Sequence, residues 1–451
     1  MIDSITAQDR CAQLLDAAKA AGADTADAIA RAESSEGVSV RLGKLEDVER
    51  SEGEEIGLRV FVGRRSASVH TSDFSAAAFA ELAERAVAMA KLAPEDPYAG
   101  LAPSEALLLG EADIAALDLK GDDEPGPDAL RDRALEAEDA ARAVDGVTNS
   151  EGSSASYGHA VVALATSNGF SGGYEGAFHS IYSSVISGNG ADMQRDSASR
   201  SARHLEDLLP PAEIGALAGQ RAVAKSNPGA MRSRAMPVVF DPRIGGSLLG
   251  HLTGAMLGPS IARKSSFLLG KEEDGLFPHG IRIVEDPLKP RGMRSRPFDG
   301  EGVATTQRTL VENGRITGWL TNVASAAQLG LPLTGHASRS VGGAPGVGVA
   351  NLELAAGEVS REELIADISE GVLITEIIGQ GVNGVTGDYS RGAVGFRIEH
   401  GEITSPVSEF TIAGNLLDMF ANLRAADDLE TWRAINVPTL RIEGMTVAGD
   451  G

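Results

Sequence analysis

The amino-acid sequence predicts an α+β protein with more than one domain. Three short strands followed by a helix are expected near the start of the chain, which is the pattern of a small α+β unit. Further strands are expected between residues 147 and 187, and the chain after Gly300 is again rich in strands, with turns at Asn313-Gly314 and His400-Gly401. At 451 residues, the chain is long enough for two or three domains and a substantial core.

The first unit is expected to begin with a helix over residues 8–21, because apolar positions recur there at helical spacing up to Gly22. Cys11, the single cysteine, is interpreted as a small core residue of this helix. An amphipathic helix is expected over Ser75–Leu92, with Ser75 as its N-cap. The strands expected between these helices are Val38–Leu42, Ile56–Val62 and Ser66–His70.

A segment rich in Pro, Gly and acidic residues, about 96–126, is interpreted as a linker or a long surface excursion. The second unit begins with a predicted helix over Asp128–Val144 and contains a hairpin signal at Ser167-Asn168-Gly169. Helices over Ser199–Leu208 and Pro211–Lys225 are expected to close it. The strands expected around the hairpin signal are Val147–Tyr157, Ala160–Thr166, Gly169–Tyr174 and Phe178–Ser187.

Asn227-Pro228-Gly229 is the preferred domain boundary. The prediction is therefore an N-terminal α+β domain, residues 1–228, followed by a C-terminal domain, residues 229–451. Within the first domain, residues 1–95 and 127–228 are candidate sub-units on either side of the linker.

The C-terminal domain is expected to open with a strand at Met236–Phe240 and a helix capped by Asp241, with Pro242 at its first position, running to about Leu257. Glycines recur every fourth residue along one flank of this helix, at Gly246, Gly250, Gly254 and Gly258. Because glycine weakens a helix, we expect close backbone packing along that flank. Two later helices are expected over Val323–Leu329 and Arg361–Ile368.

Charge and composition narrow the classes of function. A net charge of -24 argues against a large electrostatic grip on nucleic acid, and the one basic cluster, Arg291, Arg294 and Arg296, is interpreted as an exposed loop with solvated arginines. One cysteine permits no intrachain disulfide, the first residues do not resemble a signal peptide, and no apolar run is long enough to span a membrane. We therefore expect a cytoplasmic protein that binds neither nucleic acid nor membrane.

The segment Thr375–Asn415 combines many glycines with charged and aromatic residues. Its second half predicts a hairpin of Val394–Glu399 and Glu402–Val407 around His400-Gly401. The earlier glycines exclude a regular helix and indicate a backbone packed closely against a peptide, a partner chain or another strand.

No HExxH, CxxC or P-loop motif is present, and no nucleophile–base pair can be recognised, so motifs alone indicate no catalytic constellation. Candidate residues are His251 in the glycine-lined helix, His336 in a loop, and Asp388, Tyr389 and Arg391 in the glycine-rich segment. For His251 a packing role is favoured over ligation. For Asp388 and its neighbours an internal ion pair or a loop-ordering hydrogen bond is favoured over catalysis.

The chain resembles the TldD/PmbA family over nearly its full length. The residues that carry the resemblance include GHLTGAMLG (Gly250–Gly258), RKSSFLLG (Arg263–Gly270), PFDGEG (Pro297–Gly302), LPLTGHA (Leu331–Ala337), TNSEG (Thr148–Gly152) and the block from Thr375 to Asn415. The resemblance implies a dimer whose C-terminal domain is built on curved antiparallel sheet. It also implies a cytoplasmic metalloprotease of two different subunits, TldD and PmbA (TldE), that encloses its active site and cleaves unfolded peptides. An older description, modulator of DNA gyrase, finds no support in the charge.

The resemblance implies that members of the TldD branch carry the motif HExxxH on the helix after the first strand of this domain. In those proteins the motif binds zinc and supplies a general base. The corresponding positions here are Gly250, His251 and Ala255, and Cys11 lies in the wrong domain to act as a distal ligand. Three protein ligands and a base are the usual minimum for a hydrolytic zinc site. The chain therefore resembles the PmbA branch, with no metal of its own and zinc expected in a TldD-like partner.

Three functional hypotheses follow. The first is a non-metal subunit that pairs with a TldD-like protease and helps hold unfolded peptide, forming a homodimer when isolated. The second is an autonomous metal-dependent hydrolase that uses His251, His336 and Asp388. The third is a non-catalytic, chaperone-like module that binds peptides.

Overall fold

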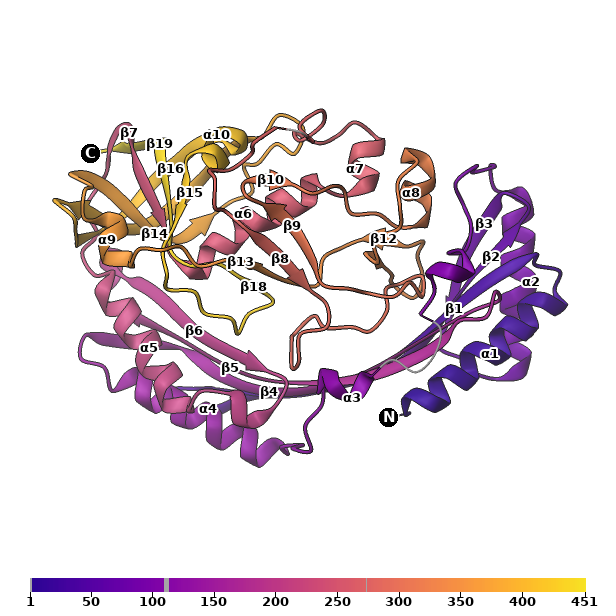
Figure 1. Cartoon of the computed structure of the whole chain (residues 1–451). Coiled ribbons are helices and arrows are strands. Elements are labelled where there is room, and N and C mark those ends of the chain that lie inside the picture. Colours follow the sequence, from indigo (N-terminus) through magenta and orange to yellow (C-terminus); the bar gives the residue numbers. More distant parts are fainter. Residues whose placement is uncertain (1, 109–112, 273) are drawn as a thin grey trace.

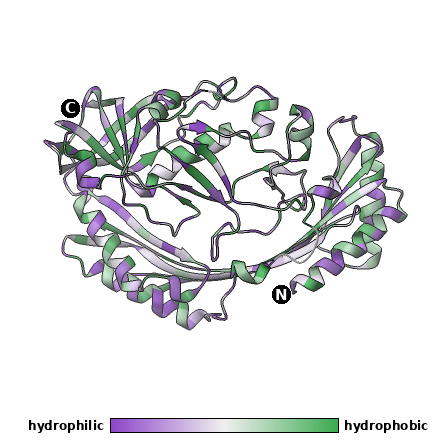
Figure 2. Cartoon of the chain, viewed as in Figure 1, coloured by the Kyte–Doolittle hydropathy of each residue, from purple (hydrophilic) through white to green (hydrophobic). Residues whose placement is uncertain are grey.

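A long curved sheet and a C-terminal domain seated in its hollow side form the protein (Figure 1). The computed structural model describes residues 2–108, 113–272 and 274–451. The helices of the N-terminal half lie on the outer side of the sheet, where each covers part of it with its apolar face. Figure 2 shows hydrophobic and hydrophilic residues alternating along these helices, as expected where one face is buried.

The N-terminal sheet has six antiparallel strands in the order β3-β2-β1-β4-β5-β6. β1 of the first predicted sub-unit pairs with β4 of the second, from Asp27 opposite Thr166 to Val40 opposite Ser153. One sheet therefore spans both sub-units. Its strands are β1 (Thr25–Arg41), β2 (Lys44–Val62), β3 (Arg65–Thr71), β4 (Val147–Thr166), β5 (Ser171–Ser187) and β6 (Gln194–Ala202).

These strands are longer than the sequence predicts. β1 begins at Thr25, not at Val38, and its buried first half is built largely from alanines, which favour helix by propensity. The predicted breaks near Gly158 and between residues 174 and 178 are absent: Gly158 stays in β4, and a Cβ there would lie 2.3 Å from the Phe178 ring on β5. The hairpin at Ser167-Asn168-Gly169 is confirmed.

The predicted helix over Ser199–Leu208 is wrong. Residues up to Ala202 continue β6, which pairs with β5 from Gln194 opposite Ser187 to Ala202 opposite His179. Only a single 3-10 turn, Leu205–Asp207, follows. Pairing with a neighbouring strand has here overridden the local helical preference.

The outer helices match the prediction closely. α1 (Ser4–Ala20) starts four residues earlier than expected because Asp3 caps it, and it buries Cys11 against the sheet. α2 (Ala76–Leu92) is capped by the Ser75 side chain, as predicted. α4 (Pro127–Arg142) and α5 (Pro211–Ala224) cover the other half of the sheet.

The predicted linker packs against the C-terminal domain. It includes η1 (Ser104–Ala106) and α3 (Ile114–Leu117), whereas residues 109–112 lie outside the described part of the chain. Leu107 pairs with Val303, and the Leu108 amide donates to the Gly302 carbonyl. Arg291, expected to be solvated, instead forms ion pairs with Asp118, Glu206 and Asp207, which ties the basic loop to the N-terminal half.

The C-terminal domain is built around a sheet that curves until it closes. Its strands follow the order β16-β15-β14-β7-β19-β17, and β16 also pairs with β19. All neighbours are antiparallel except β14 and β7. The strands are β7 (Arg232–Phe240), β14 (Glu370–Ile378), β15 (Asp388–Glu399), β16 (Glu402–Asn415), β17 (Leu423–Ala425) and β19 (Leu440–Asp450).

A second sheet of five short strands, in the order β10-β9-β8-β13-β18, lies beside this barrel, together with a two-stranded pair. The predicted turns at Asn313-Gly314 and His400-Gly401 join β9 to β10 and β15 to β16 with positive φ at both residues of each turn. The short strands are β8 (Ile283–Asp286), β9 (Arg308–Glu312), β10 (Arg315–Ile316), β11 (Ala337–Ser338), β12 (Gly346–Val347), β13 (Asn351–Leu354) and β18 (Ile435–Asn436).

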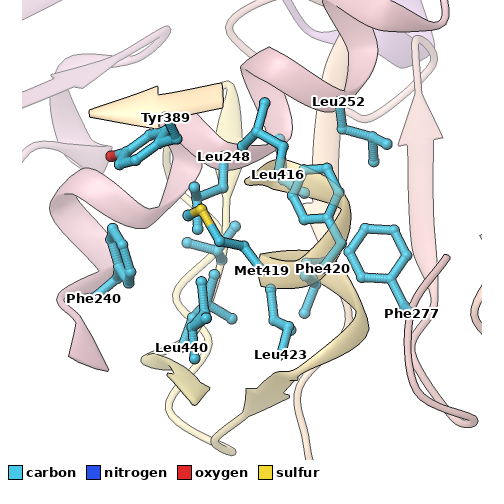
Figure 3. Packing of buried hydrophobic residues seen from close by; sticks show 14 of the residues in the cluster. Phe240, Leu248, Leu252, Phe277, Tyr389, Leu416, Met419, Phe420, Leu423 and Leu440 are labelled. Carbon is cyan, nitrogen blue, oxygen red and sulfur yellow. The ribbon is translucent and has the colours of Figure 1, made fainter. Parts of the chain in front are cut away.

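The main core forms where helix α6 (Pro242–Ala255) and helix α10 (Leu416–Ala421) meet the barrel strands (Figure 3). Leu248 and Leu252 of α6 and Phe420 of α10 point into this core. The remaining helices are α7 (Gly258–Ala262), α8 (Val323–Leu329) and α9 (Arg361–Ile365), the last shorter than predicted. No helix that the structure describes is both long and apolar enough to cross a membrane.

Close packing along the glycine flank of α6 is only partly as expected. A Cβ on Gly246 would lie 3.3 Å from Ile435, and one on Gly258 would lie 2.7 Å from the Ser325 hydroxyl. Gly250 and Gly254 have no neighbouring atom within 4 Å of such a Cβ. The expectation is therefore wrong for these two glycines, which lie on an exposed part of the helix.

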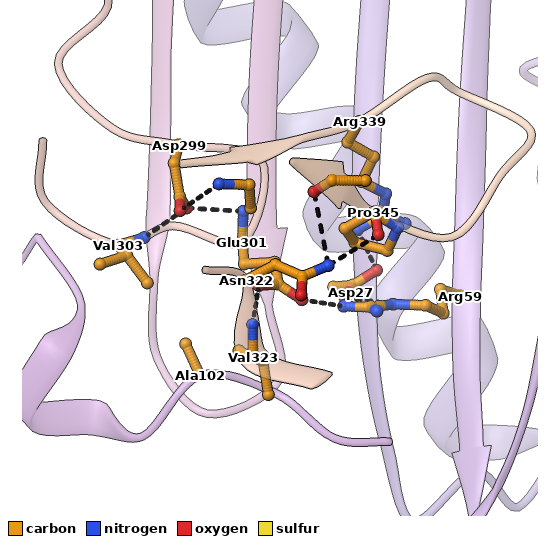
Figure 4. A network of polar contacts seen from close by, with 12 residues as sticks. Asp27, Arg59, Ala102, Asp299, Glu301, Val303, Asn322, Val323, Arg339 and Pro345 are labelled. Atoms are coloured by element: carbon orange, nitrogen blue, oxygen red, sulfur yellow. Dashed lines mark hydrogen bonds and ion pairs between the residues drawn. The ribbon is translucent and has the colours of Figure 1, made fainter. Parts of the chain in front are cut away.

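A buried cluster of charges joins the sheet to the C-terminal domain (Figure 4). Asp27 on β1 forms ion pairs with Arg59 on β2 and with Arg339 of the C-terminal domain. Arg59 lies a further 3.6 Å from Glu301, whose carboxylate also accepts the Val323 amide at 2.8 Å. Burial raises the pKa of Glu301 to about 7, although Arg59 acts against that rise. The pKa of Asp27 is lowered, because Arg339 and Arg59 together outweigh the effect of its burial.

Beside this cluster, the backbone of β2 touches the C-terminal domain directly. A Cβ on Gly57 would lie 1.8 Å from the Val341 carbonyl oxygen, so no side chain fits at this position without backbone movement. Gly53, four residues earlier on the same strand, has open space at the corresponding point.

Gly57→Ala is expected to lower the free energy of unfolding by about 1–3 kcal/mol, because the added methyl must displace backbone. Gly53→Ala is the matched control, and it should be neutral or slightly stabilising, since alanine restricts the unfolded chain. Urea unfolding of both variants measures the difference. Equal stability of the two variants would contradict the close contact between β2 and residue 341.

The charge cluster predicts a pH dependence of stability. Because the folded-state pKa of Glu301 lies above its ordinary value of 4.5, the folded protein keeps a proton that the unfolded chain has lost. The contribution of this group to stability therefore falls as pH rises from about 4.5 to about 7 and then stays constant. Glu301→Gln should flatten this part of the curve of unfolding free energy against pH. Glu312 is exposed, so Glu312→Gln is the control and should keep the pH dependence of the original protein. A Glu301→Gln curve parallel to that of the original protein would refute the raised pKa of Glu301.

Candidate functional site

Helix α6 places the three residues that the sequence singles out at its C-terminal half. The Asp241 side chain caps the helix by accepting the Arg243 amide at 2.9 Å, and Pro242 occupies its first turn, as predicted. Gly250 is exposed, His251 is half-buried, and Ala255 is buried in the main core. Only one of these three positions therefore offers a side-chain donor.

His251 lies against the glycine-rich segment. Its ring meets the Tyr389 ring edge-on at a centroid distance of 6.1 Å. Burial, with a further contribution from the Arg391 charge, lowers the pKa of His251 below its ordinary value. Its Nε2 atom is buried, and no atom among the described residues accepts from it or donates to it.

The residues Asp388, Tyr389 and Arg391 at the start of β15 serve different roles. Asp388 is exposed, and hydrogen bonds from Thr386 and Asn415 hold its pKa below the usual range. Tyr389 is buried in the main core, and burial raises its pKa to about 12. Arg391 lines a large cavity. The structure thus brings Tyr389 and Arg391 toward His251 and leaves Asp388 on the surface.

His336 lies elsewhere and is fully engaged. It is buried, contacts the Thr334 hydroxyl at 2.8 Å through Nδ1, and pairs with Glu285 of β8 through Nε2. Glu285 also accepts the Ala350 amide. This arrangement holds three segments of the C-terminal domain together and leaves the imidazole without a free face toward solvent.

The glycine-rich segment packs against strands of its own domain. A Cβ on Gly381 would lie 1.9 Å from the Ser390 carbonyl oxygen, and one on Gly395 would lie 1.8 Å from the Leu373 carbonyl oxygen. Of the three neighbours that the sequence left open, a strand of the same chain is the one observed. Gly379 and Gly384 of the same segment face open space.

The residues on α6 do not fit a zinc site. The one imidazole faces a phenol and lies within the field of an arginine, with no carboxylate or thiolate beside it. Across the described residues, no group of three or more His, Cys, Asp or Glu side chains could hold a metal ion. Cys11 is buried under the N-terminal sheet, where its thiol lies 3.7 Å from the Ala163 carbonyl oxygen.

A cavity of about 1080 Å³ opens between the N-terminal sheet and the C-terminal domain. We call it the interdomain cavity. Its walls come from β6, α5, the first turns of α6, residues 375–377 of β14 and residues 430–435. Of the residues that line it, the sequence had singled out Arg391 as a candidate site residue, Arg294 as a solvated arginine and Gly246 as part of a helix flank, and it had not indicated that they share a cavity. One signal was available in the sequence: Trp432, one of only two tryptophans, is followed by an arginine.

Three domain models of one protein family match the chain. They are described as PmbA/TldA metallopeptidase domain 1, central domain and C-terminal domain, and they match residues 26–90, 120–226 and 233–449. The chain is 37% identical to the metalloprotease PmbA of Escherichia coli O157:H7 over 91% of this chain and 89% of that protein. It is 34% identical to the PmbA homolog of Haemophilus influenzae over 92% and 90% of the two chains.

Two solved structures share the fold. A Bacteroides thetaiotaomicron protein described as a modulator of DNA gyrase aligns with a TM-score of 0.89 at 23% identity, covering 98% of this chain and 99% of that one. TldE from Thermococcus kodakarensis aligns with a TM-score of 0.85 at 21% identity, covering 98% and 100%. These likenesses confirm the α+β fold. The matches in sequence establish that the chain belongs to the PmbA/TldD metallopeptidase family.

Proposed function

We propose that this chain is the PmbA/TldE-type, non-metal subunit of a cytoplasmic TldD-type protease that cleaves unfolded peptides. The observation that carries the proposal is the donor set on α6. In a family described as metallopeptidases, this helix presents Gly250, His251 and Ala255, a single imidazole where hydrolytic zinc needs three ligands and a base. Zinc and the general base are accordingly assigned to a TldD-like partner.

The role proposed for this chain is to complete the chamber and to hold peptide. The interdomain cavity, between the N-terminal sheet and the C-terminal domain, supplies a large concave surface. β6 lies at the end of the sheet order, and a strand edge can pair with extended peptide through backbone hydrogen bonds. Such pairing is indifferent to sequence, which suits a protease of unfolded chains. Because the two branches share one fold, a homodimer is proposed for the chain in isolation.

The alternative of an autonomous hydrolase receives no support from the geometry. Its three candidate ligands do not converge: His251 faces Tyr389, His336 is buried against Glu285, and Asp388 is exposed beside Thr386. A binding module without any role in proteolysis uses the same concave surface. It differs from the leading proposal only in having no metal-bearing partner.

Purified chain is expected to raise the cleavage of an unfolded peptide by a TldD-like subunit of the same organism that carries HExxxH. Neither protein should match the mixture when assayed alone. The readout is the rate of cleavage of a casein-derived peptide at increasing ratios of this chain to that subunit, with serum albumin as the inert control. Equal activity of the TldD-like subunit with and without this chain would refute the proposal.

A further inference from the structure

The interdomain cavity carries an excess of positive charge, although the whole chain has a net charge of -24. Seven arginines and four acidic residues line it. All four carboxylates already have cationic partners: Glu151 lies 3.7 Å from Arg195, Asp196 and Glu376 pair with Lys225 at 3.0 and 2.8 Å, and Glu430 lies 3.9 Å from Arg433. The acidic side chains of the cavity are therefore not available to neutralise further cations.

Four of the lining arginines have no acidic partner in the described part of the chain. No carboxylate that the structure describes lies within ion-pair distance of the guanidinium groups of Arg200, Arg221, Arg294 and Arg391. Arg221 donates to the Ser197 carbonyl at 3.1 Å, and Arg391 reaches the Ile378 carbonyl at 3.5 Å. Guanidinium groups are the protein donors best matched to carboxylates.

Arg200 is held in place by an aromatic ring and keeps its donors free. Its guanidinium lies 4.2 Å from the centre of the Trp432 ring, and that of Arg433 lies 3.8 Å from the same ring. The indole nitrogen donates to Glu430 at 2.9 Å, which fixes the ring between the two cations. The Nε atom of Arg200 is buried, and no hydrogen-bond acceptor among the described residues reaches it. A preorganised donor without an acceptor is a feature of an anion site.

The electrostatic surroundings agree with this interpretation. Burial lowers the pKa values of Arg200 and Arg433, and it lowers that of Arg221 to about 10, with a further contribution from the Arg243 charge. A bound anion would stabilise these buried positive charges and would offset the repulsion between Arg221 and Arg243. The cavity, at about 1080 Å³, is much larger than a simple inorganic anion requires and suits a ligand of several residues.

The wall formed by β6 favours an extended peptide as that ligand. Two cations at the end of α5 cover the first part of its outer edge, because Lys225, the C-cap of that helix, and Arg221 donate to the carbonyls of Arg195 and Ser197. Every second residue of a strand faces the same way, so the residue of β6 that follows Arg195 and Ser197 on this side is Ser199. It is exposed and lines the cavity. An extended backbone beside Ser199 would place its acidic groups among the unpaired guanidinium groups.

We propose that the interdomain cavity binds a carboxylate of an extended peptide, through Arg200, Arg294 and the neighbouring unpaired arginines. The carboxylate can come from an acidic side chain or from the free C-terminus, since the recognising chemistry is the same. The inference rests on the proposed role in handling unfolded peptides, and it adds a preference for peptides that carry negative charge.

The test measures binding of Gly/Ser peptides, labelled at the N-terminus with an uncharged BODIPY fluorophore, to the full-length chain by fluorescence anisotropy. Four probes combine glutamate or glutamine at two internal positions with a free or an amidated C-terminus. The uncharged probe, with glutamine and an amide, is expected to bind at least about tenfold more weakly than the charged ones, the lower end of what a hydrogen bond to a charged group contributes. The two singly modified probes show which carboxylate is recognised.

Arg200→Gln and Arg294→Gln are each expected to weaken binding of the charged probes by about tenfold and to reduce its dependence on salt. Neither change should affect the uncharged probe. Arg131→Gln is the matched control, because Arg131 lies on the outer helix α4 with Asp128 and Asp132 as partners. Arg294 is exposed, so its variant should fold even if that of Arg200 does not.

Equal binding of charged and uncharged probes would overturn the inference, and so would variants that bind like Arg131→Gln. If inorganic phosphate binds to the chain and none of the four peptides does, the inference is also overturned, in favour of a site for small anions. If binding depends on charge while the TldD-like subunit needs no help from this chain, the proposed function fails and the carboxylate site stands. If this chain raises protease activity but binds all probes equally, only the carboxylate site fails.

Discussion

Buried ion pairs fix the C-terminal domain in the hollow of the N-terminal sheet, and the other functional features depend on that placement. At one end Asp27, Arg59, Arg339 and Glu301 join β1 and β2 to the C-terminal domain. At the other end the buried Lys225 pairs with Asp196 on β6 and Glu376 on β14. Breaking such a pair leaves an uncompensated charge in the interior, so each cluster holds the two parts in one arrangement. The interdomain cavity has β6 and β14 in its walls, and two members of the second cluster, Asp196 and Glu376, line it.

In the proposed function, the C-terminal domain and its junction with the N-terminal sheet have different roles. The barrel and α6 preserve the framework on which a metallopeptidase of this family is built, while α6 has a single donor at the three positions of interest. The surfaces that can contact a peptide, namely the edge of β6 and the arginines of the cavity, lie where the N-terminal sheet meets that framework. A single imidazole at those three positions together with a concave, charged surface suits the proposed role of positioning substrate for a partner.

Local signals were sufficient to predict most of the helices and turns. The Ser75 and Asp241 caps, the Pro242 start of α6 and the glycine turns at residues 314 and 401 appear in the structure as expected. The strands of the N-terminal sheet were underestimated because much of their length is alanine-rich or exposed and polar, and pairing with neighbours extends them. The mistaken helix at residues 199–208 has the same cause.

The candidate site was less predictable for a related reason. His251, Tyr389 and Arg391 were named from the sequence, and packing brings them together across α6 and β15. Arg200, Arg221 and Trp432 are far apart in the sequence and meet only because β6, α5 and a late loop enclose one cavity. Charge pairing of this kind has no periodic signature, so only the folded arrangement shows which arginines lack a carboxylate.

The central claim is that this chain works without a metal of its own beside a partner that carries one. Native mass spectrometry of the chain mixed with the TldD-like subunit, in zinc-containing buffer, tests this most directly. The account predicts a heteromeric complex in which zinc stays with the TldD-like subunit on dissociation, and a metal-free species for the chain alone. Stoichiometric zinc on the isolated chain, or the absence of any heteromeric complex, would contradict it.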